Sequence, residues 1–224
     1  MRILTVETSG LLCGSSVWAD GRIVCELSFA GKKVHSTNVM NLVEQALALA
    51  CCSVQDIDVF AAVGGPGSYT GIRIGMSVVK ALGQTENKPC VCVDALEAMA
   101  AEIPAFDGLI CPVIDAKADH VFTARFRSGM PPVRLTEDTS VRTDDLIRSL
   151  QACGERVLLV GEDLSPFRAR FEDGLGAQVL FTAPQRTFPT PGTICELAAR
   201  YAEAGRGMDA ADLKPSYLKR PQIG

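Results

Sequence analysis

The 224-residue chain is poor in the residues that metal sites and nucleic-acid surfaces use most. It has two histidines, His35 and His120, and neither has a second ligand at helical spacing, which argues against a metal enzyme. Twenty-two basic against twenty-six acidic residues give a net charge of −4. We therefore expect no broad surface that grips nucleic acid by neutralising its phosphates.

Long hydrophobic runs and targeting signals are also missing. No apolar run approaches the about 20 residues of a membrane span, and Glu7 interrupts the start before the apolar core of a signal peptide could form. The nine cysteines include Cys51-Cys52 and Cys90-x-Cys92, which match neither zinc spacing nor a C-x-x-C redox motif. We expect a soluble, cytoplasmic protein in which Cys51 and Cys52 are small core fillers.

What the chain does have is a globular composition and a repeated order of elements. Hydrophobic residues make up 47% and charged residues 21% of it, as in folded domains. Apolar runs and turn residues predict three strands, a helix, a strand and a helix, and this order returns less completely from Leu109 onward. We expect two similar lobes, residues 1–104 and 105–224, in an α/β fold.

Local signals predict where several elements begin. Asp20-Gly21 predicts a hairpin, Ser36 an N-cap of an amphipathic helix through Ala50, and Asp94 the cap of a helix through residue 101.

The stretch VGGPGSYTGIRIG, residues 63–75, has five glycines in thirteen residues directly after an apolar run. A Walker A loop fails because no two glycines are five apart and no lysine follows. A dinucleotide fingerprint fails because residue 70 is threonine and Pro66 removes an amide donor. Pro66 also breaks the G-x-S-x-G pattern of a serine hydrolase, so we interpret Ser68 as a helix cap.

Gly67, Gly71 and Gly75 are four residues apart, which places them in one column on a helix. Such a column allows another backbone to approach closely, and the rest of this helix is too apolar for a solvent-facing side. We predict that it packs between its own sheet and a second surface. That surface is either part of the same domain or a helix from another chain.

Two strands end in an acidic residue at equivalent places in the two halves, in Glu7-Thr8-Ser9 and Asp115-Ala116-Lys117. Turns of this kind could face each other across a cleft and hold a nucleotide with magnesium. The alternative is that both are polar turns without a ligand.

Several motifs together resemble the TsaB family, also called YeaZ, over nearly the whole chain. They are Val6-Glu-Thr-Ser9, Val34-His-Ser36, Gly64 to Gly75, Val113-Ile-Asp-Ala-Lys117, Val160-Gly-Glu-Asp163 and Pro215-Ser-Tyr-Leu-Lys-Arg-Pro221. The resemblance implies an actin-like, sugar-kinase-like (ASKHA) fold with two β-β-β-α-β-α lobes. It also implies a non-catalytic scaffold that binds and activates TsaD for threonylcarbamoyl transfer to the adenosine beside the anticodon of tRNA.

The same resemblance implies partners and ligands. TsaD forms the heterodimer, the TsaE ATPase joins the larger complex, the chain forms a homodimer when alone, and tRNA is contacted only indirectly. No cofactor is firmly expected. A nucleotide, ATP or ADP with magnesium, would lie either at the joint with the partner or at the cleft, whose residues would be Thr8, Ser9 and Asp115.

The resemblance finally implies that the helices beginning near Ser36 and Tyr69 pair with the corresponding helices of TsaD or of a second copy. The expected interface residues are His35, Ser36, Met40, Val43, Leu47, Gly67, Tyr69, Thr70, Gly71, Ile72, Arg73, Gly75 and Met76. Of these, Met40, Leu47, Ile72 and Met76 are expected to be exposed, and a bulky residue at Gly71 to abolish TsaD binding without unfolding the chain. The alternative function is a stand-alone actin-fold ATPase or small-molecule kinase that uses Glu7, Thr8 and Asp115 around magnesium.

Overall fold

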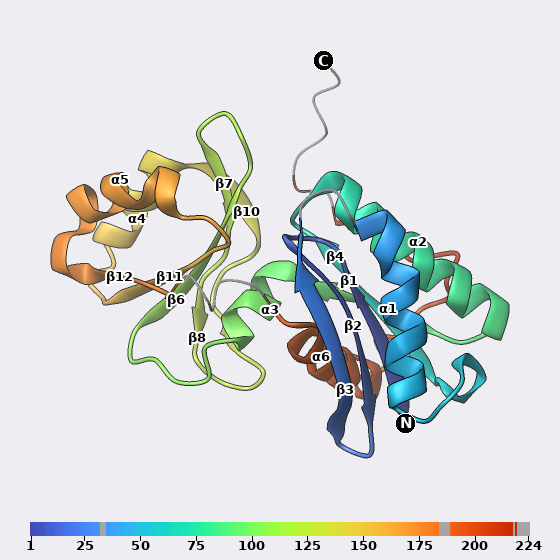
Figure 1. Cartoon of the computed structure of the whole chain (residues 1–224). Helices are drawn as coiled ribbons and strands as arrows, with labels where there is room; N and C mark the ends of the chain where they lie inside the picture. Colours follow the sequence, from blue (N-terminus) through green and yellow to red (C-terminus); the bar gives the residue numbers. More distant parts are fainter. Residues whose placement is uncertain (32–34, 184–188, 217, 219–224) are drawn as a thin grey trace. The chain divides into compact units, whose positions relative to one another are not determined.

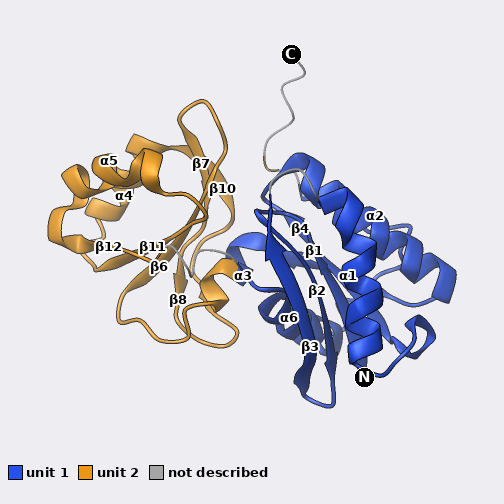
Figure 2. Cartoon of the chain, in the orientation of Figure 1, with its two compact units in different colours: residues 1–98, 189–216 blue, residues 99–188, 217–224 orange. Residues whose placement is uncertain are grey.

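The computed structural model describes residues 1–31, 35–183, 189–216 and 218 (Figure 1). The chain divides into two compact units (Figure 2). Unit 1 is residues 1–98 with 189–216, and unit 2 is residues 99–188 with 217–224. Among the described residues, every helix is too short or too polar to cross a membrane.

Unit 1 is built on a five-stranded sheet with the strand order β3-β2-β1-β4-β5. Its elements are β1 (Arg2–Glu7), β2 (Leu12–Ala19), β3 (Arg22–Ala30), α1 (His35–Leu49), a 3₁₀ turn (Val54–Asp56), β4 (Val59–Gly65), α2 (Tyr69–Glu86), β5 (Cys90–Asp94), α3 (Ala95–Ala101), which crosses the unit boundary, and α6 (Pro191–Glu203). Strands β1, β2 and β3 are antiparallel, and β4 and β5 run parallel to β1.

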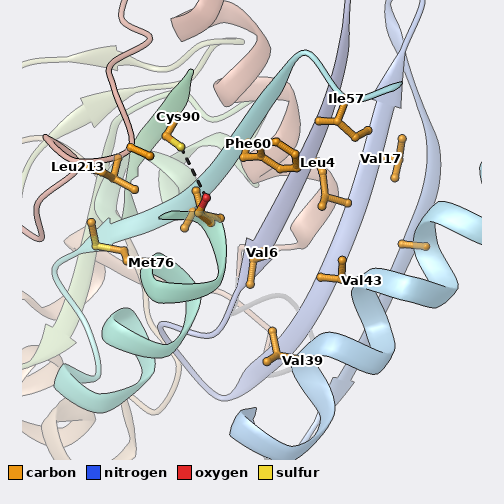
Figure 3. Packing of buried hydrophobic residues seen from close by; sticks show 14 of the residues in the cluster. Leu4, Val6, Val17, Val39, Val43, Ile57, Phe60, Met76, Cys90 and Leu213 are labelled. Atoms are coloured by element: carbon orange, nitrogen blue, oxygen red, sulfur yellow. Dashed lines mark hydrogen bonds between the residues drawn. The ribbon is translucent and has the colours of Figure 1, made fainter. Parts of the chain in front are cut away.

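Helices cover both faces of this sheet. Helices α1 and α2 lie on one face and α6 lies on the other (Figure 1). Leu4 and Val6 of β1 belong to the same core cluster as Val39 and Val43 of α1 (Figure 3). Burial on both faces is the reason that β4 is a continuous apolar run and that β1 is buried from Ile3 to Glu7, instead of alternating between buried and exposed residues.

Unit 2 repeats the arrangement with the strand order β10-β7-β6-β11-β12. Its elements are β6 (Leu109–Asp115), β7 (His120–Thr123), β8 (Phe126–Arg127), β9 (Val133–Arg134), β10 (Thr139–Arg142), α4 (Thr143–Gln151), β11 (Val157–Val160), α5 (Ser165–Leu175), a 3₁₀ turn (Gly176–Gln178) and β12 (Val179–Phe181). Its parallel and antiparallel pairings match those of unit 1, with β8 and β9 added beside β6. The predicted actin-like fold with two similar lobes is confirmed.

The predicted lobe boundaries are wrong for the C-terminal segment. Residues 189–216 were expected in a lobe spanning 105–224, but they return to unit 1. In α6, Ile194 and Leu197 are completely buried, and the Cys195 thiol donates a hydrogen bond to the Ile3 carbonyl at 3.7 Å. The physical reason is that the second face of the first sheet needs an apolar cover, which α6 supplies.

The local predictions are mostly correct. Asp20 and Gly21 have φ angles of 53° and 80° in the hairpin between β2 and β3, and the Glu97 amide donates to Asp94 Oδ1 at 2.7 Å at the start of α3. Helix α1 begins at His35, so Ser36 lies inside its first turn and the prediction of Ser36 as its N-cap is wrong.

The nine cysteines are all free thiols in very different surroundings. Cys52 packs partly buried against the core of unit 1, whereas Cys51 is exposed, so its interpretation as a core filler is wrong. Burial raises the pKa of the Cys111 thiol to about 11 and that of Cys195 to about 12. A buried thiol with a raised pKa forms little reactive thiolate near neutral pH.

Thiol labelling tests this assignment. With N-ethylmaleimide at pH 7.5, we expect the exposed Cys51 and Cys153 to react within minutes, and Cys111 and Cys195 to react only after denaturation. Peptide mass spectrometry identifies the labelled residues. Rapid labelling of Cys195 in the native protein would contradict the placement of α6 on the sheet.

Candidate partner-docking site

A shallow groove of about 490 Å³ lies between α1 and α2, which run side by side in Figure 1. Its lining residues are Ser36, Val39, Met40, Tyr69, Thr70, Arg73, Ile74, Ser77 and Val78. Met40 is 42% and Tyr69 is 40% exposed, which is high for apolar side chains of this size. None of the nine lining residues is acidic.

The helical repeat explains why these side chains of α2 face outward together. Ser68 caps the helix by accepting a hydrogen bond from the Gly71 amide at 3.2 Å, which confirms its predicted role. Tyr69, Arg73 and Ser77 then follow at intervals of four residues and form one stripe. The Arg73 guanidinium lies 3.9 Å from the centre of the Tyr69 ring, a stacking contact that orders both side chains.

The glycine column lies on the opposite side of α2 and faces the chain's own first strand. A Cβ atom added at Gly71 would lie 2.0 Å from the Thr8 carbonyl oxygen, and one added at Gly75 would lie 2.6 Å from Thr8 Oγ1. Gly67 precedes the helix, and its added Cβ would lie 2.8 Å from the Ser9 carbonyl. The prediction that this column meets another chain is therefore wrong, because the approaching backbone is the turn after β1.

Four more of the expected interface residues are buried or partly buried in unit 1. Ile72 is 2% and Met76 is 3% exposed, so both belong to the core of unit 1 and not to its surface. Val43 is likewise 2% exposed, and Leu47 is partly buried against the same core.

The remaining expected residues divide between structural and surface positions. His35 is half-buried, and its Nε2 donates to the Leu12 carbonyl at 3.1 Å. The groove contains five of the thirteen expected residues, Ser36, Met40, Tyr69, Thr70 and Arg73.

The second surface that packs against α2 comes from the same chain. Residues 208–216 lie against α2 and the edge of β5, with Leu213 only 1% exposed. Of the two alternatives that the apolar helix left open, packing within its own domain is correct on this side.

The turn after β1 uses its hydrogen-bond donors internally. Glu7 is 1% exposed, and its Oε1 accepts hydrogen bonds from the Ser9 amide at 2.7 Å, the Ser9 hydroxyl at 2.7 Å and the Gly10 amide at 3.2 Å. Thr8 Oγ1 donates to the Gly71 carbonyl at 2.7 Å. These contacts hold the glycine block against β1.

Asp115 ends the equivalent strand of unit 2 and is more accessible. Its carboxylate accepts from the Lys117 amide at 2.8 Å and pairs with Lys117 Nζ at 2.5 Å. Across the described parts of the chain, no three His, Cys, Asp or Glu side chains gather as a metal site requires. The nucleotide role of Thr8, Ser9 and Asp115 stays a prediction.

Comparisons with known proteins identify the family. A family model described as TsaD, tRNA N6-adenosine threonylcarbamoyltransferase, matches residues 28–219. The chain is 31% identical to the tRNA threonylcarbamoyladenosine biosynthesis protein TsaB of Bacillus subtilis, over 98% of this chain and 94% of that protein. It belongs to the TsaB (YeaZ) family.

Two further relatives agree with the family and the fold. TsaB of Escherichia coli is 26% identical over 98% of this chain and 95% of its own length. YeaZ from Pseudomonas aeruginosa superposes with a TM-score of 0.80 at 19% identity, covering 97% of this chain and 99% of that one, and so has the same fold. TsaB proteins act in the biosynthesis of threonylcarbamoyladenosine in tRNA.

Four groove residues were not among the expected interface residues: Val39, Ile74, Ser77 and Val78. The signal for three of them was present in the sequence. Ile74 and Val78 continue the spacing of Thr70, and Ser77 continues that of Tyr69 and Arg73. The glycine column drew attention to the other side of the same helix.

Replacing Gly71 with alanine tests whether the glycine column faces the chain's own backbone. The free energy of unfolding should fall if it does and rise if the position is open. At a solvent-exposed position inside a helix, replacing glycine with alanine raises the free energy of unfolding by about 1 kcal/mol. Here the new methyl group meets a backbone carbonyl, so we expect the free energy of unfolding to fall by about 1–3 kcal/mol.

Chemical denaturation measures this change, with Ser77→Ala on the exposed side of the same helix as the control. A Gly71→Ala variant more stable than the parent would contradict the packing against Thr8.

Proposed function

We propose that this chain is a non-catalytic subunit that docks TsaD in the groove between α1 and α2 and activates threonylcarbamoyl transfer to the adenosine beside the anticodon of tRNA. The observation that carries the proposal is an exposed apolar groove on two neighbouring helices of a TsaB-family chain. Exposed apolar surface rimmed by polar residues is typical of protein interfaces.

The kinship with TsaD supports a matching surface on the partner. The family model that matches residues 28–219 is itself described as TsaD, so a related fold can present an equivalent pair of helices. Two helix pairs of this kind can pack face to face in a four-helix arrangement.

The charge of the groove indicates what TsaD must contribute. Arg73 is the only charged residue among the nine lining residues that the structure describes, and it is stacked on Tyr69. A preordered guanidinium loses little conformational freedom when it binds a carboxylate. We infer that an acidic side chain of TsaD pairs with Arg73 near the middle of the interface.

The proposal also covers the second copy of the chain, TsaE and tRNA. A second copy would occupy the groove when TsaD is absent, and TsaE would join through the complex. Because the chain carries a net charge of −4, tRNA would be held mainly by TsaD.

A second candidate function is ATP hydrolysis or small-molecule phosphorylation at Thr8, Ser9 and Asp115. Against it stands the Glu7 carboxylate, which already occupies the Ser9 and Gly10 amides that a phosphate would need. We expect the purified chain alone to release no phosphate from ATP with magnesium in a coupled assay. Turnover that disappears in Asp115→Ala would overturn the scaffold proposal in favour of an enzyme.

Ser77→Arg tests the docking groove directly. Ser77 is exposed, so the variant should keep the parent's unfolding free energy within about 0.5 kcal/mol. The long cation fills the groove one turn from Arg73, and we expect calorimetry to show TsaD binding weakened by at least about tenfold, or 1.4 kcal/mol.

The matched control is Gln151→Arg, an exposed position on helix α4 of unit 2. It should leave the affinity for TsaD unchanged. If Ser77→Arg and Gln151→Arg bind TsaD with equal affinity, the proposal that TsaD docks in the groove is wrong.

A further inference from the structure

We propose that the C-terminal strap, residues 208–216, positions the docking side of α2, and that Lys80 is the positioning residue that ties the strap to the helix. The inference rests on the proposed function, because it concerns the geometry of the same groove. It assigns a role in partner binding to residues that do not line the groove.

The strap is fixed to the sheet at its beginning. Met208 and Cys90 exchange backbone hydrogen bonds of 2.9 and 2.8 Å, and Ala210 and Leu213 are 3% and 1% exposed. Leu213 belongs to the core cluster that also includes Met76 of α2 (Figure 3). The strap is therefore a packed layer of unit 1 and not a loose tail.

Lys80 connects the strap to the C-terminal half of α2. Its Nζ donates to the carbonyl oxygens of Ala211 at 3.3 Å and Leu213 at 3.1 Å. Lysine on a helix surface ordinarily keeps its ammonium group in water. Here the ammonium group instead satisfies two backbone acceptors of a segment that is remote in sequence, and hydrogen bonds to charged groups are the stronger ones.

The strap also holds the turn that leads into α2. The Ser216 amide donates to the Gly64 carbonyl at 2.8 Å, and Gly65, at a φ of 124°, leaves room for the Ser216 carbonyl that a Cβ atom would approach to 2.7 Å. Four residues after Gly65 the helix starts at Tyr69.

The strap thus contacts the chain before α2 and again in the C-terminal half of this helix, at Lys80. Between these points lie Tyr69, Arg73 and Ser77, the exposed stripe of the groove. On the sheet side the helix is held at Gly71 by Thr8. Loosening the strap leaves α2 attached to β1 but free to shift along or about its axis, which moves the stacked Arg73.

The test compares Lys80→Met, which keeps the aliphatic stem and removes the ammonium group, with Lys214→Met on the exposed part of the strap. Both variants lose one positive charge. Amide hydrogen exchange of the free chain and calorimetric affinity for TsaD are measured for each. Lys80→Arg is included because a guanidinium can restore the hydrogen bonds.

For Lys80→Met we expect faster exchange in residues 64–78 and unchanged exchange in α1 and β6. We also expect TsaD binding to be weakened at least about tenfold, because two charged hydrogen bonds are lost. Lys80→Arg should recover most of the affinity, and Lys214→Met should behave as the parent chain. Exchange that rises equally in α1 and α2 would mean a loss of general stability and would overturn the positioning role.

The outcome is separable from the docking proposal itself. If Ser77→Arg abolishes TsaD binding while Lys80→Met and Lys214→Met match in exchange and affinity, the groove stands and the strap has no positioning role. If Ser77→Arg leaves binding unchanged, the docking proposal fails, and the exchange data from the free chain still report whether Lys80 holds residues 64–78.

Discussion

The close approach of α2 to the turn after β1 is the constraint on which the rest of unit 1 depends. Gly71 has no room for a side chain beside the Thr8 carbonyl, and Gly75 has little beside the Thr8 hydroxyl. The turn itself is held by the buried Glu7 carboxylate, so helix and strand are joined through a rigid element. Because one side of α2 is pressed against β1, the helical repeat determines that Tyr69 and Arg73 face away from it. The groove is thus a consequence of glycines that face the turn after β1.

The order of elements could be predicted from the sequence because it depends on local signals. Asp20-Gly21 specified a hairpin, the pattern from Ser36 to Ala50 specified an amphipathic helix, and the returning order after Leu109 specified a second lobe of the same kind. Which side of α2 faces outward could not be predicted in the same way. A column of glycines shows that some backbone comes close, and the pattern is the same whether that backbone belongs to the same chain or to another. Ile72 and Met76 were misassigned for the same reason, since apolar residues on a nearly all-apolar helix carry no sign of which side is covered.

The packing of late segments of the chain on unit 1 could not be predicted from the sequence either. Helix α6 and the strap at 208–216 pack in unit 1 after residues 99–188 of the second unit have intervened. Neither segment has a sequence pattern that indicates which sheet it packs against, because an amphipathic helix fits any sheet face of suitable width. The two units share one topology and differ in what they expose. Unit 1 turns its first loop inward and presents a helix groove, which is the surface that we propose for docking a related partner.

Photo-crosslinking from single positions tests the central claim most directly. A benzophenone amino acid placed at Met40, on the groove, is compared with one at Val133, an exposed apolar residue of unit 2 that is 57% accessible. With TsaD present, the account predicts a covalent heterodimer from position 40 and none from position 133. A crosslink from position 133 without one from position 40 would place the partner elsewhere and contradict the account.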